Sequence, residues 1–402
     1  MHIAWLGKKS PFCGNVTYSR EVTNALLDRG YQVSFLHFAQ EADIPTNVFP
    51  GFNPGQNPNG ANGWQLAAEV SLPCIYKSTI YTIPTLKSSK VLSEALRQLQ
   101  PDLVHASLTL SPLDFVLPEI CEELNLPLVA TFHPPFAHQN RPLTSGRQRL
   151  QHLTYQLYAP FLPNYDKTIV FSDLQRDLLG ELNVPKNQVE VIPNGVDVRK
   201  YSPGYSQIKY ELNARILFVY QGRIAMEKNV EALLKAWKQS NLGPDCKLAI
   251  VGDGPLAASL QATYGPEHNI LWLGYVGDEQ RRIEILRGAD VFILPSLVEG
   301  LSLSLLEAMA CGLACIATDV GADGEVLSNG AGIVVSTQSL TTQLKTVLPL
   351  LRDQPELIKI LGQKARQRVL ERYTLSANIT MLEELYDRLL QQYPLVTVTA
   401  LA

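Results

Sequence analysis

Residues 216–239 read ILFVYQGRIAMEKNVEALLKAWKQ and contain the unit from which most of the chain is built. The run Ile216–Tyr220 is short, apolar and rich in β-branched and aromatic residues, which predicts a buried strand. Val230–Gln239 carries apolar residues at helical spacing, and Gly222–Lys228 forms a short turn between the two segments. The stretch therefore predicts a strand followed closely by a helix, which is the unit of a parallel sheet.

The same alternation of strands and helices extends along the chain in both directions. In the first half the expected strands are His2–Leu6, Gln32–His37, Leu103–Ala106, Leu128–Thr131, Lys167–Phe171 and Val189–Ile192. The expected helices there are Val16–Asp28, Ser88–Gln98, Leu113–Leu124 (interrupted or restarted at Pro118) and Leu174–Leu182. The second half adds the expected strands Lys247–Val251, Ile270–Leu273, Val291–Leu294, Ala314–Ala317 and Ile333–Val335. It also adds the expected helices Leu256–Tyr264, Glu279–Arg287 and Ser302–Ala310.

Two such series predict an α/β protein with two doubly wound, Rossmann-like domains that face a cleft. We expect an N-terminal domain over residues 1–196 and a C-terminal domain over residues 197–374, joined near Pro193-Asn194-Gly195-Val196-Asp197. A predicted helix at about residues 375–393 would return to the N-terminal domain. Ligands of such folds bind at the carboxyl ends of the strands, so the cleft is the expected site.

The composition of the chain argues against several classes of protein. Hydrophobic residues make up 46% and charged residues 18% of the chain, which is typical of a globular protein, and the net charge of −4 argues against a nucleic-acid partner. The six cysteines are scattered without metal-ligand spacing, so we expect reduced thiols and no metal or other cofactor. No run of 18 apolar residues is present, and the first apolar run is too short for a signal peptide. We therefore expect a cytoplasmic protein, at most peripheral on a membrane.

The turn Gly222–Lys228 carries the first chemical signal. Arg223 and Lys228 place two cations on a strand-to-helix turn, where ligands bind in this fold class. Two fixed cations beside exposed backbone suit a diphosphate and would neutralise the charge that develops when a diphosphate leaves. The alternative is a solvated loop that happens to be basic.

The second signal is the stretch Glu299–Glu307, which follows an expected strand and opens an expected helix. Gly300 lets a ligand approach the backbone, and the helix N-terminus favours phosphate oxygens. The backbone amides that would serve this purpose are those of Ser302, Leu303 and Ser304. Glu307 lies one turn into the helix, where a carboxylate can accept both hydroxyls of a ribose, and Glu299 could contact a transferred sugar. The alternative is a capped surface helix with acidic residues.

Three weaker signals remain. Gly14 lies in the turn Ser10–Val16 after the first strand, where glycine lets a phosphate or sugar approach the backbone. His133 ends an expected strand and could bind a sugar hydroxyl, although a lone histidine is more often structural, as we expect for His105. Gly252–Ala257 has the GxGxxA form of a dinucleotide fingerprint, but it follows the second strand of its domain and lacks a clear acid about 20 residues later.

Two segments could serve an acceptor. Residues 51–63 are rich in Gly, Pro and Asn and predict a loop, either a surface insertion or a lid. Residues 139–167 contain Arg141, Arg147, Arg149 and Lys167 against Asp166. The helix expected at 147–162 carries Leu150, Leu153, Leu157, Tyr158 and Phe161 at helical spacing. Basic residues beside such a face suit an anionic membrane, and the alternative is a helix packed on the first sheet.

Taken together, these segments resemble glycosyltransferase family 4, which has the GT-B architecture. Val191–Asp197 is similar to its interdomain signature, and Gly222-Arg223 with Lys228 is similar to its diphosphate clamp. Glu299–Glu307, continuing to Gly312, resembles its two-glutamate motif, and Gly321 with Glu325 resembles its later glycine and glutamate. The resemblance covers nearly the whole chain and is most specific over residues 190–330.

The resemblance implies a retaining hexosyltransferase that needs no metal, with an N-terminal acceptor domain and a C-terminal nucleotide-sugar domain. It implies catalytic roles for Arg223, Lys228, Glu299 and His133. The implied donor-binding residues are Gly14, Gly222, Arg223, Lys228, Tyr275, Val276, Gly300, Ser302, Leu303, Ser304 and Glu307. Tyr275 and Val276 would hold the base through their backbone, and His133 would lie by the transferred sugar. Two departures, Cys13-Gly14 for a glycine pair and Asp323-Gly324 for glycine-proline, could alter sugar selection.

Leu6–Tyr18 resembles the cyanobacterial branch of the family that includes digalactosyldiacylglycerol synthases. That resemblance implies UDP-galactose as donor and monogalactosyldiacylglycerol as acceptor, at a peripheral membrane surface served by Arg141, Arg147 and Arg149. The alternatives are a soluble sugar or polysaccharide precursor as acceptor, a UDP-sugar epimerase or hydrolase of the same fold, and a non-catalytic sensor.

Overall fold

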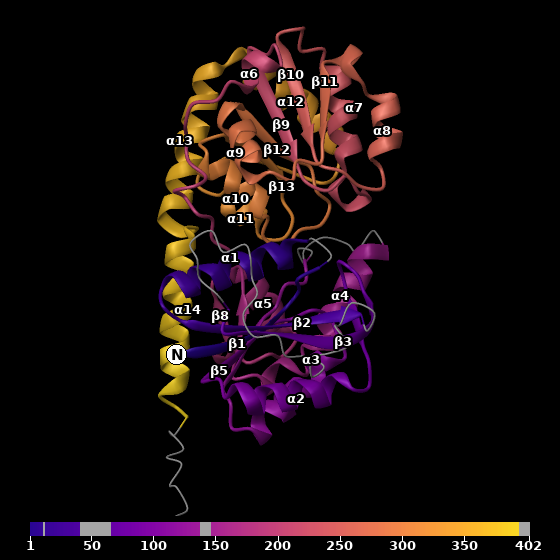
Figure 1. The fold of residues 1–402 in the computed structure, drawn as a ribbon. Coiled ribbons are helices and arrows are strands. Elements are labelled where there is room, and N and C mark those ends of the chain that lie inside the picture. The colour runs from indigo at the N-terminus through magenta and orange to yellow at the C-terminus, as the bar shows by residue number, and fades with distance from the viewer. Residues whose placement is uncertain (11–12, 41–65, 137–145, 394–402) are drawn as a thin grey trace, which may run out of the picture. The chain divides into compact units, whose positions relative to one another are not determined.

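The structure is a computed structural model of the 402-residue chain and describes residues 1–10, 13–40, 66–136 and 146–393 (Figure 1). It divides into two compact units. The N-terminal unit comprises Met1–Pro134, Leu153–Ile192 and Asn378–Ala402, and the C-terminal unit comprises Pro135–His152 and Pro193–Ala377. Both units are built on a parallel sheet, as the sequence predicts.

The N-terminal unit contains an eight-stranded sheet in the order β4-β3-β2-β1-β5-β6-β7-β8. Its strands are β1 His2–Gly7, β2 Gln32–Gln40, β3 Ala68–Lys77, β4 Thr82–Pro84, β5 Leu103–Ser107, β6 Leu128–Thr131, β7 Lys167–Val170 and β8 Val189–Val191. Its helices are α1 Gly14–Asp28, α2 Ser88–Leu99, α3 Leu113–Glu123, α4 Gly146–Tyr158 (from Leu153 on), α5 Asp173–Glu181 and α14 Leu375–Leu390 (from Asn378 on). All strand pairs are parallel except β3 with β4, which form an antiparallel hairpin at the sheet edge.

The hairpin β3–β4 has no counterpart among the strands expected from the sequence. Pro73 lies within β3, and a proline inside an apolar run argues against a strand because it cannot donate to the ladder. In the structure Pro73 pairs in register with Ala39 of β2, and Thr85 N and Ser88 Oγ both donate to its carbonyl oxygen.

The expected interruption of the helix at Pro118 is wrong, because α3 runs unbroken from Leu113 to Glu123 with Pro118 inside. A proline in a helix removes the donor for the carbonyl four residues earlier, here that of Asp114. The Tyr165 hydroxyl donates to Asp114 O at 2.6 Å and replaces the missing N–H. A residue 51 positions away along the sequence therefore keeps the helix continuous.

Helix α14 packs on the N-terminal sheet through one aromatic contact in particular. The Tyr386 hydroxyl lies 2.5 Å from Nδ1 of His105 on β5, and the other ring nitrogen of His105 lies 2.7 Å from Thr131 Oγ1. Trp5 stacks on the same imidazole at 4.0 Å. His105 is fully buried with both nitrogens bonded, which agrees with a structural role.

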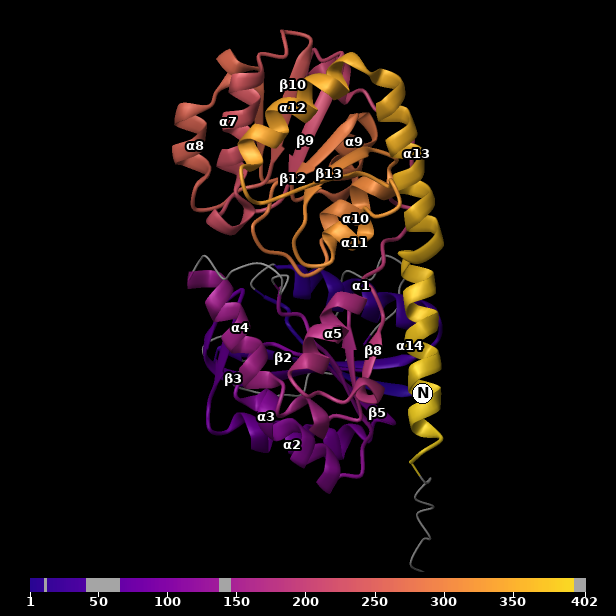
Figure 2. The same cartoon turned by 180° about the vertical axis from the view of Figure 1, so that it is seen from behind.

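The C-terminal unit contains a six-stranded parallel sheet in the order β11-β10-β9-β12-β13-β14. Its strands are β9 Ile216–Gln221, β10 Cys246–Val251, β11 Ile270–Gly274, β12 Val291–Leu294, β13 Ala314–Thr318 and β14 Ile333–Val335. Its helices are α6 Ile208–Glu211, α7 Val230–Ser240, α8 Ala257–Thr263, α9 Glu279–Gly288, α10 Leu303–Ala310, α11 Asp323–Val326, α12 Leu340–Asp353 and α13 Pro355–Arg372. α7 packs against α12, which both views show (Figures 1 and 2).

Helices α12 and α13 have no counterpart among the helices expected from the sequence. α13 crosses β13 and α10 so closely that a Cβ at Gly362 would lie 2.1 Å from Gly312 O, which explains the glycine on this helix. In the part of the chain that the structure describes, no helix is both long and apolar enough to cross a bilayer.

Candidate functional site

The turn after β9 is held by hydrogen bonds that its amides donate to the end of β10 and to the turn after β10. Gly222 N donates to Val251 O and Ile224 N to Asp253 O, both at 2.9 Å. The Tyr220 hydroxyl donates to Arg223 O at 2.8 Å. These contacts position the backbone on either side of Arg223, whose side chain is about half exposed.

The segment with the GxGxxA pattern is the other partner in this contact. Gly252 and Gly254 adopt φ of +136° and +158°, and Cβ atoms there would lie 1.9 Å from Gly222 O and 2.4 Å from Ile224 O. Both positions therefore need glycine so that two backbones can pack together. The two glycines of the GxGxxA pattern are explained by their close packing against the turn that carries Arg223. A bound dinucleotide is not needed to explain them.

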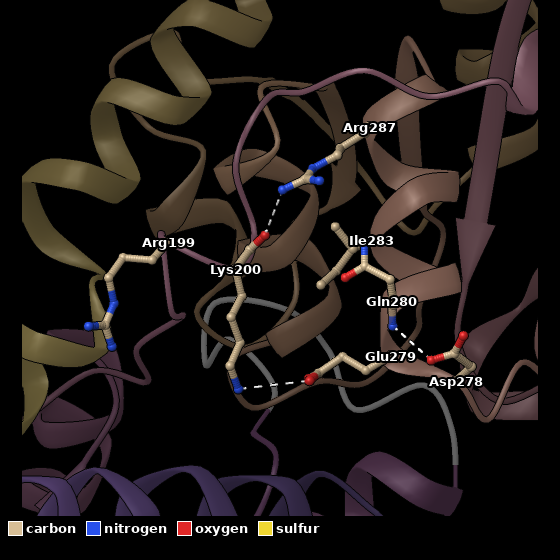
Figure 3. A pocket seen from close by; sticks show the side chains of 7 residues that line it. All are labelled: Arg199, Lys200, Asp278, Glu279, Gln280, Ile283 and Arg287. Carbon is tan, nitrogen blue, oxygen red and sulfur yellow. Dashed lines mark hydrogen bonds and ion pairs between the residues drawn. The ribbon is translucent and has the colours of Figure 1, made fainter. Parts of the chain in front are cut away.

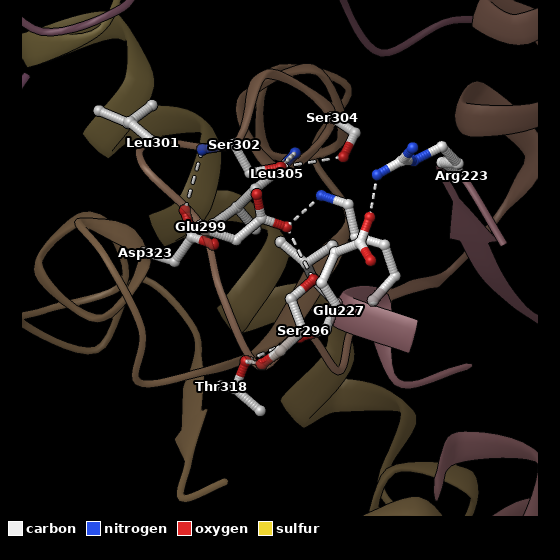
Figure 4. A network of polar contacts seen from close by, with 12 residues as sticks. Arg223, Glu227, Ser296, Glu299, Leu301, Ser302, Ser304, Leu305, Thr318 and Asp323 are labelled. Atoms are coloured by element: carbon white, nitrogen blue, oxygen red, sulfur yellow. Dashed lines mark hydrogen bonds and ion pairs between the residues drawn. The ribbon is translucent and has the colours of Figure 1, made fainter. Parts of the chain in front are cut away.

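Lys228 and Glu299 form a largely buried ion pair at the carboxyl ends of β9 and β12. Lys228 Nζ lies 2.6 Å from Glu299 Oε1, and the two side chains are 22% and 10% exposed. The Ser296 hydroxyl donates to the same carboxylate oxygen at 2.7 Å (Figure 4). Arg223 pairs with Glu227 at the end of the network visible in Figure 4. Both predicted cations thus form ion pairs with carboxylates, and the Lys228–Glu299 pair is less exposed to solvent than the Arg223–Glu227 pair.

A second loop packs on the stretch that begins with Glu299. Gly321 adopts φ of +55°, and a Cβ there would lie 2.3 Å from the carbonyl oxygens of Glu299 and Gly300. Ala322 N donates to Gly300 O at 2.7 Å. The close approach of these backbones explains the glycine at 321.

Asp323 is a site residue that sequence reasoning recorded only as a departure from the family pattern. It is fully buried, and its Oδ1 accepts a hydrogen bond from Ser302 N at 3.0 Å (Figure 4). Burial, and then the Glu299 carboxylate, raise the pKa of Asp323 well above its usual value. Its proximity to Glu299 could not be read from a separation of 24 residues.

Helix α10 begins at Leu303, one residue later than expected, because Ser302 is its N-cap and accepts from Leu305 N. The first amides of a helix have no acceptor within the helix, so Leu303 and Ser304 present N–H groups at this end. Glu307 follows one turn later and accepts from Gln221 Nε2 at 2.9 Å. Gln221 ends β9 and was missed, although its place directly before Gly222 was visible in the sequence.

The turn after β11 contains Tyr275 and Val276. Tyr275 is 68% exposed, which is unusual for an aromatic ring and leaves it able to stack on a planar group. Arg282 of α9 donates to the carbonyls of Val276 and Gly277, both at 3.0 Å, and so fixes the turn. Arg282 is a further residue that sequence reasoning missed.

His133 lies in the N-terminal unit, where a chain of hydrogen bonds favours one of its tautomers. Asn15 Nδ2 donates to Leu108 O, which orients the amide, and the Ser107 hydroxyl donates to Asn15 Oδ1 at 3.1 Å. Ser107 Oγ lies 2.7 Å from His133 Nε2, and a Ser107 hydroxyl that donates to Asn15 favours the tautomer with the proton on Nε2 and Nδ1 as an acceptor. Burial, and then the Lys8 charge, lower the pKa of His133 to about 3.

The remaining predicted residues are Gly14 and the three arginines Arg141, Arg147 and Arg149. Gly14 begins α1, and no atom of the described residues lies within 4 Å of where its Cβ would be, so packing does not demand glycine there. Arg141 and the loop 51–63 lie outside the described residues, and the side chains of Arg147 and Arg149 on α4 do too. The apolar residues expected along one face of α4 differ in exposure. Tyr158 is buried, whereas Leu153 and Leu157 are more than half exposed.

A separate pocket of about 470 Å³ lies beside α9 and the segment that contains Arg199 and Lys200 (Figure 3). Its lining consists of Arg199, Lys200, Asp278, Glu279, Gln280, Ile283 and Arg287. None of the predicted donor residues lines it. Over the described ranges, no cluster of three or more His, Cys, Asp or Glu side chains is arranged to hold a metal ion.

The two Rossmann-like units define the class of protein, which is that of GT-B glycosyltransferases. The solved structure of sucrose-phosphate synthase from Thermosynechococcus elongatus superposes with a TM-score of 0.75 over 97% of this chain and 99% of that one, at 20% identity. Residues 13–200 match Glycosyltransferase Family 4, and residues 206–368 match Glycosyl transferases group 1. The chain therefore belongs to the family 4 and group 1 glycosyltransferases.

Two curated relatives are similar in sequence. One is the Escherichia coli UDP-Gal:alpha-D-GlcNAc-diphosphoundecaprenol alpha-1,3-galactosyltransferase, 29% identical over 56% of this chain and 58% of its own length. Another is the alpha-monoglucosyldiacylglycerol synthase of Streptococcus pneumoniae, 28% identical over 57% of this chain and 54% of its own. The chain thus spans less than two thirds of the length of these relatives.

Proposed function

We propose that the chain is a retaining glycosyltransferase that moves a hexose from a nucleoside-diphosphate sugar to a membrane glycolipid. The observation that carries the proposal is the Lys228–Glu299 pair beside the first amides of α10, with Arg223 on the neighbouring turn. Cations and helix amides of this kind suit a diphosphate, and a buried carboxylate beside them suits sugar hydroxyls.

The chemistry follows from where the charge develops. The bond between C1 of the hexose and the β-phosphate oxygen breaks, and Arg223 and Lys228 stabilise the charge on the departing diphosphate. The acceptor oxygen bonds to C1 on the same face, and its proton passes to the released phosphate oxygen. Because the two cations neutralise the leaving group, we propose that no metal is required.

Other predicted residues take positioning roles in this proposal. Glu307 accepts the ribose hydroxyls, Tyr275 stacks on the base, and Glu299 orients the hexose. The neutral His133 accepts a hydrogen bond from a sugar hydroxyl at Nδ1, in the tautomer whose Nε2 donates to Ser107, 2.7 Å away.

We propose UDP-galactose as donor and monogalactosyldiacylglycerol as acceptor. UDP-galactose is the donor named for the Escherichia coli relative, whose acceptor carries an undecaprenol lipid. The Streptococcus pneumoniae relative is named for a diacylglycerol glycolipid. The segment Leu6–Tyr18, with its resemblance to digalactosyldiacylglycerol synthases, supports the specific acceptor.

The test is product formation from radiolabelled UDP-galactose with monogalactosyldiacylglycerol dispersed in detergent. UDP-glucose and soluble sugar acceptors run in parallel, together with a reaction that contains no acceptor. Labelled digalactosyl lipid with an α-configured new bond supports the whole proposal. Product only from soluble acceptors, or only from UDP-glucose, removes the acceptor or donor assignment. Donor consumption without an acceptor would instead indicate an epimerase or hydrolase.

A further inference from the structure

The hairpin Ile75–Leu86, which includes the end of β3, the turn and β4, exposes an unusual concentration of apolar side chains. Its exposed members are Ile75, Tyr76, Ile80, Tyr81, Ile83 and Leu86. Leu86 is fully exposed, and Ile75 and Ile80 are 67% and 61% exposed. A solvated hairpin would show polar residues at these positions, so the face requires an explanation.

Strand pairing directs these side chains outward. Tyr76 and Ile83 are opposite each other in the register of β3 and β4, and both are exposed. The register shifts between Cys74 and Tyr76, and this bulge allows Ile75 to be exposed as well, although it is adjacent to Tyr76. The rings of Tyr76 and Tyr81 are 5.6 Å apart and form one aromatic surface.

The turn of the hairpin is anchored at the carboxyl end of β1. The Lys8 ammonium, only 5% exposed as a residue, donates to the carbonyls of Ser78, Thr79 and Ile80 at 3.2–3.4 Å. Lys77 Nζ donates to Ser10 Oγ at 2.9 Å on the same loop after β1. These hydrogen bonds fix the apolar hairpin against the N-terminal sheet, at the carboxyl ends of the strands, where ligands of this fold bind.

The hairpin and the residues directly after it carry charge of one sign, between Glu69 on one side and Glu94 on the other. Residues 70–93 contain Lys77, Lys87 and Lys90 and no Asp or Glu, although the whole chain has a net charge of −4. Lys90 faces Glu94 at 3.8 Å, but both side chains are exposed, so solvent screens that pair. The exposed apolar face thus lies in a locally cationic region.

This charge argues against a second copy of the chain as the occupant. A symmetric contact would bring the same lysines together across the interface, and like charges oppose such an association. Addition of a strand is also disfavoured because β4 has three residues and ends in Pro84, which cannot donate a hydrogen bond. The complementary surface is instead one with negative charge and an apolar interior.

We propose that the apolar hairpin docks on an anionic lipid bilayer, with Ile80 and Leu86 entering the acyl boundary. Tyr76 and Tyr81 would lie at headgroup depth, and Lys77 and Lys87 would contact anionic headgroups. Docking presents the carboxyl end of the N-terminal sheet to the lipid. The purpose of this contact, access to a glycolipid acceptor, rests on the proposed function, but the docking itself does not.

The experiment is sedimentation of the purified full chain with vesicles of phosphatidylcholine, alone or in equimolar mixture with phosphatidylglycerol. We expect binding to the anionic vesicles that weakens with salt. Ile80→Ser with Leu86→Ser should lower the partition coefficient at least about tenfold, since each side chain would lose burial worth more than a kilocalorie. Lys87→Glu should lower binding only on the anionic vesicles.

Two control variants make the result specific. Leu350→Ser with Ile360→Ser removes side chains that are 46% and 49% exposed in the C-terminal unit and should bind vesicles like the wild type. Leu153→Ser with Leu157→Ser tests the exposed face of α4. Wild-type protein that ignores anionic vesicles, or binding lost only in the α4 variant, would overturn the proposal. A concentration-dependent dimer that the hairpin variant abolishes, without vesicle binding, would overturn it in favour of a second copy.

Transfer to detergent-dispersed acceptor separates this inference from the proposed function. Vesicle binding without any sugar transfer would remove the proposed function and keep the docking surface. Transfer in detergent without vesicle binding would do the opposite. Thermal unfolding of the hairpin variant, which changes only exposed side chains, should match that of the wild type.

Discussion

Replacement of Lys228 by methionine tests the site most directly, because it affects stability and donor use for different reasons. Glu299 is only 10% exposed, and its main cationic partner is Lys228 Nζ at 2.6 Å. Loss of one partner of a buried pair leaves an uncompensated charge and can cost 3–5 kcal/mol. The Ser296 bond to the same carboxylate remains, and Lys228 is 22% exposed, so we expect about 2 kcal/mol of lost stability.

The loss of donor use has a separate origin. A charged hydrogen bond to the diphosphate contributes about 1.5–3 kcal/mol, so kcat/KM should fall roughly tenfold to a hundredfold. The variant Lys228→Met with Glu299→Gln removes the unpaired charge. It should therefore recover most of the free energy of unfolding while kcat/KM stays low.

The assay combines denaturant unfolding with initial rates on radiolabelled UDP-galactose. Lys235→Met is the matched control, because Lys235 pairs with Glu231 at 2.7 Å but about half of each side chain is exposed. That control should change stability by less than about 0.5 kcal/mol and leave kcat/KM intact. Recovery of kcat/KM together with stability in the double variant would show that Lys228 only neutralises Glu299, and the diphosphate role would be refuted.

Four further predictions concern other parts of the two units. Glu307→Gln keeps the side-chain shape and should lower kcat/KM for the donor about tenfold or more without shifting the unfolding midpoint; unchanged kinetics would remove its ribose role. Gly252→Ala should destabilise the chain and weaken donor affinity together, because its Cβ would lie 1.9 Å from a carbonyl of the Arg223 turn, and calorimetry with UDP would detect both effects. Ser107→Ala should change the populations of the two tautomers of His133, measured by ¹⁵N NMR of the imidazole; an unchanged spectrum would contradict the hydrogen-bond chain. Burial raises the pKa of Asp114 to about 6, so the native state binds more protons than the unfolded state between pH values of about 4 and 6. The free energy of unfolding therefore falls as the pH rises through that window. Asp114→Asn should remove about 2–3 kcal/mol of this pH dependence, as measured by urea unfolding at several pH values.

Much of the fold was predictable because its signals are local. Most of the expected strands are present within one or two residues, since short apolar runs rich in β-branched residues, bounded by turn residues, differ in length from the helical segments between them. The hairpin β3–β4 was not predictable, because Pro73 argues against a strand and the groups that bond to its carbonyl, Thr85 N and Ser88 Oγ, lie beyond that apolar run. The break expected at Pro118 was wrong for a similar reason, since the donor that replaces its N–H comes from Tyr165.

The site shows the same division. The turn with Arg223 and Lys228 and the helix start after Glu299 could be found from the sequence, because each feature lies within one short segment. Asp323 could not be found from the sequence. Its place in the site depends on its burial, on the hydrogen bond that it accepts from Ser302 N, 21 residues earlier, and on the nearby Glu299 charge. The GxGxxA segment was set aside from its position in the domain, and its true role required the backbone distances.

The sequence by itself determined the alternation of strands and helices and the family, because these depend on local pattern and residue type. For the same reason it supplied the candidate residues for a diphosphate sugar, which remain a prediction. The tertiary structure decided which of those residues meet: Lys228 with Glu299 across 71 positions, and His133 with Ser107 across 26. It also decided which apolar residues remain outside, as on the hairpin Ile75–Leu86. The physical reason is that strand order and register bring distant strand ends together and set which faces are covered, and neither is encoded in any single segment.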